Sequence, residues 1–129
     1  MKITYQGVAG AYSNIAAMQV FPEQDYLPCD TFEEAMGKVS ADEADLAMIP
    51  VENSNAGRVS DVHFLLPKTG LSIVGEYLLP VHHQLLTVKG AKLEDIKTAM
   101  SHPQALAQCS AFLKEHGIRA EARIDTAKS

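Results

Sequence analysis

The sequence has no tryptophan and only two cysteines among its 129 residues. It contains no CxxC or HExxH pattern, so it predicts neither a disulfide framework nor a zinc site of common spacing. We expect Cys29 and Cys109 to be small core thiols that are reduced, as is usual in cytoplasmic proteins.

Long apolar runs and positive charge are also scarce. No stretch reaches the ~18 apolar residues that a membrane-spanning helix requires, and residues 1–7 lack the apolar region of a signal peptide. The location that these features predict is cytoplasmic. The 11 lysines and arginines are scattered, and the net charge is −5. We therefore expect no nucleic-acid partner and no membrane partner.

The residues that are present suit a globular protein, with 47% apolar and 21% charged residues. The length predicts one domain or two small lobes. Strand patterns at 2–6, 25–29 and 44–49 alternate with helix patterns at 11–20 and 31–39. This β-α-β-α-β order predicts a parallel sheet covered by helices, that is, an α/β fold.

The chain then departs from this alternation of strands and helices. A helix pattern over 59–66, with Ser60 or Asp61 as its N-cap, precedes two strand patterns at 71–79 and 81–88 that no helix separates. We interpret Leu79 to Val81 as a hinge, which predicts a first lobe at 1–79 and a second lobe at 80–129.

The second lobe has four further patterns before its end. They predict a short helix at 93–96, a strand at 98–101, a helix at 103–116 and a strand at 118–122. A last helix pattern begins at Asp125. A lobe this short has little apolar surface to bury. We therefore expect it to need the first lobe, a partner chain or further sequence for stability.

Polar loops recur where a strand ends and a helix begins, at 6–13, 52–57, 101–104 and 125–126. Open α/β sheets bind ligands at such strand ends, and helix N-termini hold anions through their N–H groups. The neutral Gln, Asn and Ser side chains there predict a site for a small dicarboxylate or oxyacid. The alternative is that these polar residues are ordinary caps and connections.

Three histidines are candidate titrating groups. His82 and His83 point to opposite faces if the segment is extended, so at most one of them reaches a ligand. His102 precedes a helix-opening proline, where it is equally suited to bind a ligand or the backbone. The sequence predicts no metal, nucleotide or other cofactor.

Four short motifs together resemble the prephenate dehydratase family from Ile3 to Ala127. In family order and spacing they are Tyr5-Gln6-Gly7 with Gly10-Ala11-Tyr12-Ser13, Pro50-Val51-Glu52-Asn53-Ser54 with Gly57 and Val59, Ser101-His102-Pro103-Gln104-Ala105-Leu106 with Gln108-Cys109, and Asp125-Thr126-Ala127.

The resemblance implies a two-lobe fold of the type II periplasmic-binding-protein kind, with the ligand in a cleft between the lobes. It implies a carbon–oxygen lyase that converts prephenate to phenylpyruvate in phenylalanine biosynthesis, without a cofactor, as a homo-oligomer, a dimer. By motif, the residues near the reacting centre would be Glu52, Asn53, Ser101 and Gln108, with Glu52 orienting its neighbours. The residues that line the cleft would be Gln6, Ala11, Ser13, Ser54, Gly57, His102, Gln104, Ala105 and Thr126.

The sequence also departs from the family pattern. It has no Thr-Arg-Phe motif, whose threonine is the key catalytic hydroxyl in the family, and no regulatory domain that senses phenylalanine. Lys128 stands where a small residue is common. We therefore expect an incomplete second lobe and little or no turnover. Two alternatives stay open: a non-catalytic small-anion-binding module of the same fold, and an arogenate dehydratase.

Overall fold

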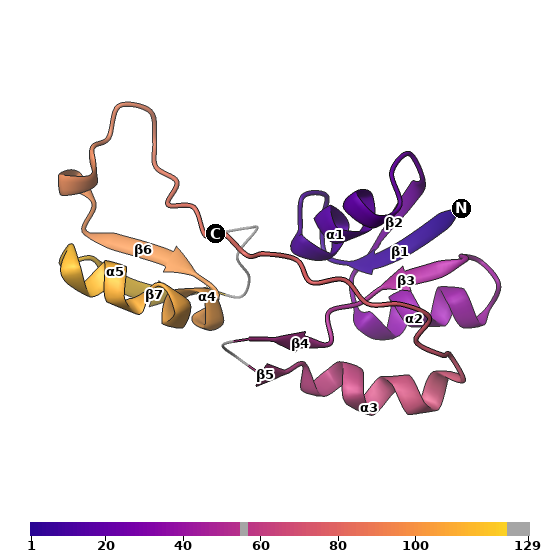
Figure 1. Cartoon of the computed structure of the whole chain (residues 1–129). Helices are drawn as coiled ribbons and strands as arrows, with labels where there is room; N and C mark the ends of the chain where they lie inside the picture. Colours follow the sequence, from indigo (N-terminus) through magenta and orange to yellow (C-terminus); the bar gives the residue numbers. More distant parts are fainter. Residues whose placement is uncertain (55–56, 124–129) are drawn as a thin grey trace. The chain divides into compact units, whose positions relative to one another are not determined.

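The computed structural model describes residues 1–54 and 57–123 (Figure 1). The chain divides into two compact units, Met1–Pro80 and Val81–Ser129. The lobe boundary at 79/80 stays a prediction. Within the described residues, no helix is both long and apolar enough to cross a membrane.

A three-stranded parallel sheet forms the centre of the first unit. The strands are β1 (Lys2–Gln6), β2 (Asp25–Cys29) and β3 (Leu46–Met48), in the order β2-β1-β3. Ile3 of the central strand pairs with Tyr26 on one side and Leu46 on the other. This arrangement confirms the predicted strands at 2–6 and 25–29, while the third strand is shorter than predicted.

Two helices cover the two faces of this sheet. The chain crosses from β1 to β2 through α1 (Tyr12–Val20) and from β2 to β3 through α2 (Phe32–Ser40). The two crossovers run in opposite directions along the sheet. Since crossovers between parallel strands are right-handed as a rule, the two helices lie on opposite faces (Figure 1). Parallel strands with both faces covered are buried throughout, and Ile3, Thr4 and Tyr5 are at most 2% exposed.

The start of α2 follows the capping pattern in the sequence. Thr31 is the N-cap, and its Oγ1 accepts a hydrogen bond from the Glu34 backbone N–H at 3.0 Å. The Glu34 carboxylate accepts one from the Asp30 backbone N–H at 2.9 Å. That bond, followed by the nearby Lys38 ammonium, lowers the pKa of Glu34. The helix predicted at 31–39 is confirmed, with its ends shifted by one residue.

One buried hydroxyl ties the sheet to α2. Thr4 is 0% exposed, and its Oγ1 donates to the Ala35 backbone carbonyl at 2.8 Å. The same oxygen lies 3.3 Å from the Leu46 carbonyl on β3. The side chain therefore contacts a helix and a neighbouring strand at once, and it satisfies its own polar group in the core.

The third helix, α3 (Ser60–Thr69), lies over the pattern predicted at 59–66 and extends three residues beyond it, but its cap differs from the prediction. Its N-cap is Val59, not Ser60 or Asp61, and no side chain caps it. The Val59 backbone N–H donates to the Val51 carbonyl at 3.0 Å, which holds Val59 extended and lets the helix start directly after it. The helix ends at Gly70, whose positive φ of 70° suits a glycine.

The second unit contains a parallel pair of strands, β6 (Thr98–Ser101) and β7 (Arg119–Ala122). The 3₁₀ turn η1 (Leu93–Asp95) precedes them. The single helix predicted at 103–116 is wrong. It is two helices, α4 (Pro103–Gln108) and α5 (Ser110–Glu115), because Cys109 has φ −95° and ψ 4° between them. The predicted strand at 98–101 is confirmed.

The strands predicted at 71–79 and 81–88 are wrong as secondary structure. Residues 71–88 lie in no helix or strand, and most of their apolar side chains are exposed, with Val74 at 81%, Leu78 at 88% and Leu86 at 86%. A segment of high strand propensity becomes a strand only when another strand pairs with it. The described part of the chain places no strand beside this segment.

We expect the substitution Thr4→Val to lower the free energy of unfolding by about 1 kcal/mol, because it keeps the volume and removes the buried hydrogen bond to Ala35. Urea unfolding followed by circular dichroism measures this change. The exposed Thr87→Val is the matched control and should change stability by less than about 0.5 kcal/mol. Equal losses in the two variants would contradict the role of the Thr4 hydroxyl.

Candidate functional site

The carboxyl ends of β1, β2 and β3 lie at one edge of the first sheet because the strands are parallel. Gln6, the last residue of β1, is half-buried there. Its Nε2 donates to the Asp30 carbonyl at 3.3 Å, and the Gly7 backbone N–H donates to the Cys29 carbonyl at 2.9 Å. The Gln6 side chain therefore faces the loop that follows β2.

The turn after β1 leads into the N-terminus of α1. Gly7 has φ +112°, and a Cβ built on it would lie 3.2 Å from the Ala11 Cβ. A side chain at position 7 would therefore both strain the backbone and crowd Ala11. Ala11 is the N-cap of α1 and has no side-chain hydrogen bond to it. A helix N-terminus of this kind is suited to hold an anion, with Ser13 half-buried in its first turn.

The polar loop predicted at 52–57 is in part a hairpin, which corrects the prediction. β4 (Glu52–Asn53) pairs antiparallel with β5 (Gly57–Arg58), so that Glu52 lies opposite Arg58 and Asn53 opposite Gly57. Gly57 has φ +76°, a backbone conformation that favours glycine. Asn53 is half-buried, while Glu52 and Ser54 are exposed.

Arg58 is a candidate binding residue that the sequence analysis missed. It is an exposed guanidinium directly across the ladder from Glu52, and a guanidinium binds carboxylates in a bidentate manner. The feature of the sequence that could have indicated Arg58 is its position, one residue after a glycine in a turn. The hairpin therefore adds a cation to a set of otherwise neutral donors.

The second unit places polar residues at the carboxyl end of β6. Ser101 ends that strand and is half-buried. His102 is the N-cap of α4, and its Nδ1 accepts from the Gln104 backbone N–H at 3.2 Å. An accepting Nδ1 carries no proton, so the neutral ring has its proton on Nε2. His102 is therefore both a helix cap and a ring with an Nε2–H donor.

Gln108, the last residue of α4, makes a side-chain contact to an earlier segment. Its Oε1 lies 2.6 Å from the His83 Nε2, and both side chains are half-buried. His82 is exposed, so the two histidines differ in environment; which of them reaches a ligand stays a prediction. The sequence analysis missed the partner of His83 because no pattern relates positions 83 and 108.

The predicted site residues thus occupy two groups, one in each unit. In the first unit they are at the end of β1, the start of α1 and the β4–β5 hairpin; in the second they are on β6 and α4, with Ala105 buried and Gln104 exposed. Thr126 lies outside the described residues. The role of each residue stays a prediction.

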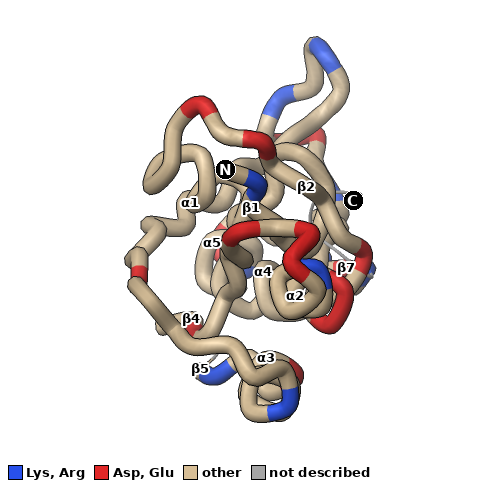
Figure 2. Tube along the Cα trace, turned by 90° about the vertical axis from the view of Figure 1, so that its right-hand side faces the viewer, with Lys and Arg blue, Asp and Glu red and all other residues tan. Residues whose placement is uncertain are grey.

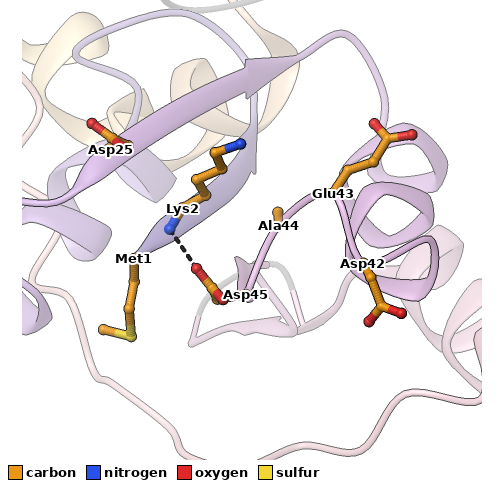
Figure 3. Close-up of a pocket in the computed structure, with 7 residues that line it drawn as sticks. All are labelled: Met1, Lys2, Asp25, Asp42, Glu43, Ala44 and Asp45. Carbon is orange, nitrogen blue, oxygen red and sulfur yellow. Dashed lines mark hydrogen bonds between the residues drawn. The ribbon is translucent and has the colours of Figure 1, made fainter.

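Two hollows in the first unit are acidic. One, of about 370 Å³, is at the amino end of β1, where the Lys2 backbone N–H donates to Asp45 Oδ2 at 2.7 Å (Figure 3). Its wall includes the carboxylates of Asp25, Asp42 and Glu43. Figure 2 shows acidic residues along the segments beside α2. Such a hollow repels a dianion.

The second hollow, of about 500 Å³, borders Gln6 but has three carboxylates, from Asp30, Glu33 and Asp61. This second hollow is therefore no better suited than the first to bind an anionic acid. Burial, followed by the Glu34 carboxylate, raises the pKa of the Cys29 thiol. A thiol of raised pKa stays protonated at neutral pH and is a poor nucleophile.

Comparisons with known proteins agree on one family. The family model described as "Prephenate dehydratase" matches residues 3–129. A bifunctional N-acyl-homoserine lactone acylase/prephenate dehydratase of Komagataeibacter europaeus is 44% identical over 125 residues, which cover 97% of this chain and 44% of that protein. The chloroplastic arogenate dehydratase/prephenate dehydratase 1 of Arabidopsis thaliana is 45% identical over 127 residues, which cover 98% of this chain and 32% of that protein.

The solved structures agree. Prephenate dehydratase from Arthrobacter aurescens, in complex with L-Phe, superposes with a TM-score of 0.76 at 29% identity, covering 100% of this chain and 44% of that chain. The predicted α/β fold of the type II periplasmic-binding-protein kind is thereby confirmed. The chain spans less than half the length of each of these relatives.

We expect His102→Ala to lower the free energy of unfolding by about 1 kcal/mol, because it removes the N-cap of α4. His102→Asn restores a capping oxygen and should recover most of that loss. Urea unfolding measures both variants, and the exposed His82→Ala serves as the control. An asparagine variant as unstable as the alanine variant would contradict the capping role.

Proposed function

The chain belongs to the prephenate dehydratase family, and we propose that it binds prephenate and contributes to its conversion to phenylpyruvate, a carbon–oxygen lyase reaction on the route to L-phenylalanine. The observation that supports this proposal best is that neutral hydrogen-bonding residues end three strands, namely Gln6 on β1, Asn53 on β4 and Ser101 on β6. Neutral groups also stand on the helices that follow two of these strands: Ser13 in the first turn of α1, and His102 and Gln108 at the two ends of α4.

The reaction needs little covalent chemistry from the protein. The bond between the ring and its carboxylate breaks and releases carbon dioxide, and its electron pair enters the ring. The ring hydroxyl leaves and becomes water on taking up a proton. Aromatisation supplies the driving force, so the protein must hold the two carboxylates and stabilise the departing hydroxyl. Preorganised hydrogen-bond donors suit both tasks.

In this proposal, Asn53, Ser101 and Gln108 act at the reacting centre as hydrogen-bond donors. Glu52 orients neighbouring groups, for which its place opposite Arg58 is suited. The uncapped N-terminus of α1, between Ala11 and Ser13, binds a carboxylate. The residues that line the remaining site are those of the family motifs: Gln6, Ser54, Gly57, His102, Gln104, Ala105 and Thr126.

Two further features belong to the proposal on the strength of the family likeness. We propose a homodimer and a cytoplasmic location. The free thiols Cys29 and Cys109 are compatible with a reducing compartment. The described residues hold no cluster of three His, Cys, Asp or Glu side chains suited to a metal, and the proposal assigns no cofactor.

We expect calorimetric titration of the chain with prephenate to show binding, and Asn53→Ala or Ser101→Ala to weaken it at least about tenfold, which is ~1.4 kcal/mol. The reason is that each variant deletes a donor to the bound acid. Ser110→Ala, an exposed serine on α5, is the matched control and should bind like the unchanged chain. Absence of any heat with prephenate would refute the proposal.

The alkaline absorbance of phenylpyruvate then separates the candidate functions. Formation of phenylpyruvate above the spontaneous rate identifies the lyase. Binding without any product favours a non-catalytic small-anion-binding module. A stronger response to arogenate than to prephenate favours an arogenate dehydratase, which the names of several relatives include.

A further inference from the structure

The first unit is acidic, which disfavours the binding of an acid. Its aspartates and glutamates are at positions 23, 25, 30, 33, 34, 42, 43, 45, 52, 61 and 76, while its only lysines and arginines are Lys2, Lys38, Arg58 and Lys68. Such an excess of carboxylates repels a dianion unless a cation lies where the dianion binds. The positions of the four cations therefore indicate where the unit can accept an acid.

Three of these cations lie away from the loops at the strand ends. Lys2 is the first residue of β1, at the amino end of the sheet. Lys38, in the last turn of α2, forms an ion pair with Glu34 at 3.4 Å. Lys68 is in the last turn of α3, at the opposite end of that helix from the β4–β5 hairpin. Arg58 is therefore the cation that is available to these loops.

Arg58 is on β5, directly opposite Glu52 on β4. Residues that are directly opposite in an antiparallel pair lie on the same face, so Arg58 shares the face of a residue that the proposed function places near the reacting centre. The Val59 N–H, 3.0 Å from the Val51 carbonyl, extends this pairing by one residue. Among the described residues, the exposed Arg58 guanidinium forms no ion pair. Its N–H groups are free to bind a carboxylate in a bidentate manner.

The two carboxylates of prephenate have different fates in the reaction. The ring carboxylate gives its electron pair to the ring and leaves as carbon dioxide, so it has less negative charge in the transition state than in bound prephenate. A guanidinium paired with it would stabilise the reactant more than the transition state and would slow the reaction. The side-chain carboxylate keeps its charge throughout and remains in phenylpyruvate. A cation at that carboxylate strengthens binding without opposing decarboxylation.

We propose that Arg58 binds the side-chain carboxylate of prephenate, the one that phenylpyruvate retains. This inference rests on the proposed function and adds a residue that determines specificity for the acid. The neutral donors of the site then act on the ring carboxylate and on the departing hydroxyl. The guanidinium contributes equally to the binding of substrate and product, because both carry the carboxylate that it contacts.

The test is calorimetric titration of the unchanged chain and three variants with prephenate and, separately, with phenylpyruvate. Arg58→Gln removes the charge and should weaken the binding of both acids by the same factor, roughly tenfold to a hundredfold. Arg58→Lys keeps the charge but not the bidentate geometry, so its affinity should lie between those of Arg58→Gln and the unchanged chain. Lys68→Gln makes the same change of charge at an exposed position of α3 and should bind like the unchanged chain.

Three results would overturn the inference and leave the proposed function intact. The first is an Arg58→Gln variant that binds prephenate as tightly as Lys68→Gln does. The second is an Arg58→Gln variant with weakened binding of prephenate and unchanged binding of phenylpyruvate, since the guanidinium would then contact the ring carboxylate or the hydroxyl. The third is an unchanged chain that binds prephenate but not phenylpyruvate.

Circular dichroism establishes that each variant is folded. Should Arg58→Gln fail to fold, Arg58→Lys decides, and an affinity for both acids equal to that of the unchanged chain would overturn the inference. An unchanged chain that binds neither acid would refute the proposed function together with the role of Arg58.

Discussion

The parallel register of β1 between β2 and β3 is the constraint on which the first unit depends. Pairing Ile3 with Tyr26 and with Leu46 brings all three carboxyl ends to one edge of the sheet. Parallel pairing also demands a crossover helix after each strand, so α1 and α2 must begin near that edge and cover the two faces. The Thr4 hydroxyl, hydrogen-bonded to Ala35 inside the core, ties the sheet to α2. The positions of Gln6, Ala11 and Ser13 follow from this arrangement.

Local signals predicted the elements that local chemistry decides. The strands at 2–6, 25–29 and 98–101 and the Thr31 cap of α2 were all predictable, because alternation and capping residues act over a few positions. The segment 71–88 was not, since its apolar pattern reports strand propensity while pairing depends on a distant strand. The break between α4 and α5 depends on the backbone conformation of Cys109 alone. The sequence has no glycine or proline at that position to indicate that the helix is interrupted.

The candidate site, too, was predictable only where local sequence decides the structure. Residue types and their places at strand ends were predictable from turn chemistry, and the structure distributes them between two units as the motifs do. Their partners were not predictable. The pairing of Glu52 with Arg58 arises from a hairpin of two-residue strands, and the contact of His83 with Gln108 joins positions that share no repeat. A sequence pattern indicates the face of a side chain, but not what the fold places opposite it.

We propose that the strand-end donors of this chain bind a small acid. A ¹H–¹⁵N correlation spectrum of the chain, recorded while prephenate is added, tests this most directly. We expect amide shifts in three stretches, at residues 7–13, 52–54 with 57–58, and 101–105. No shift in these stretches, or shifts centred on the acidic hollow around Lys2, Asp25 and Asp45, would contradict it.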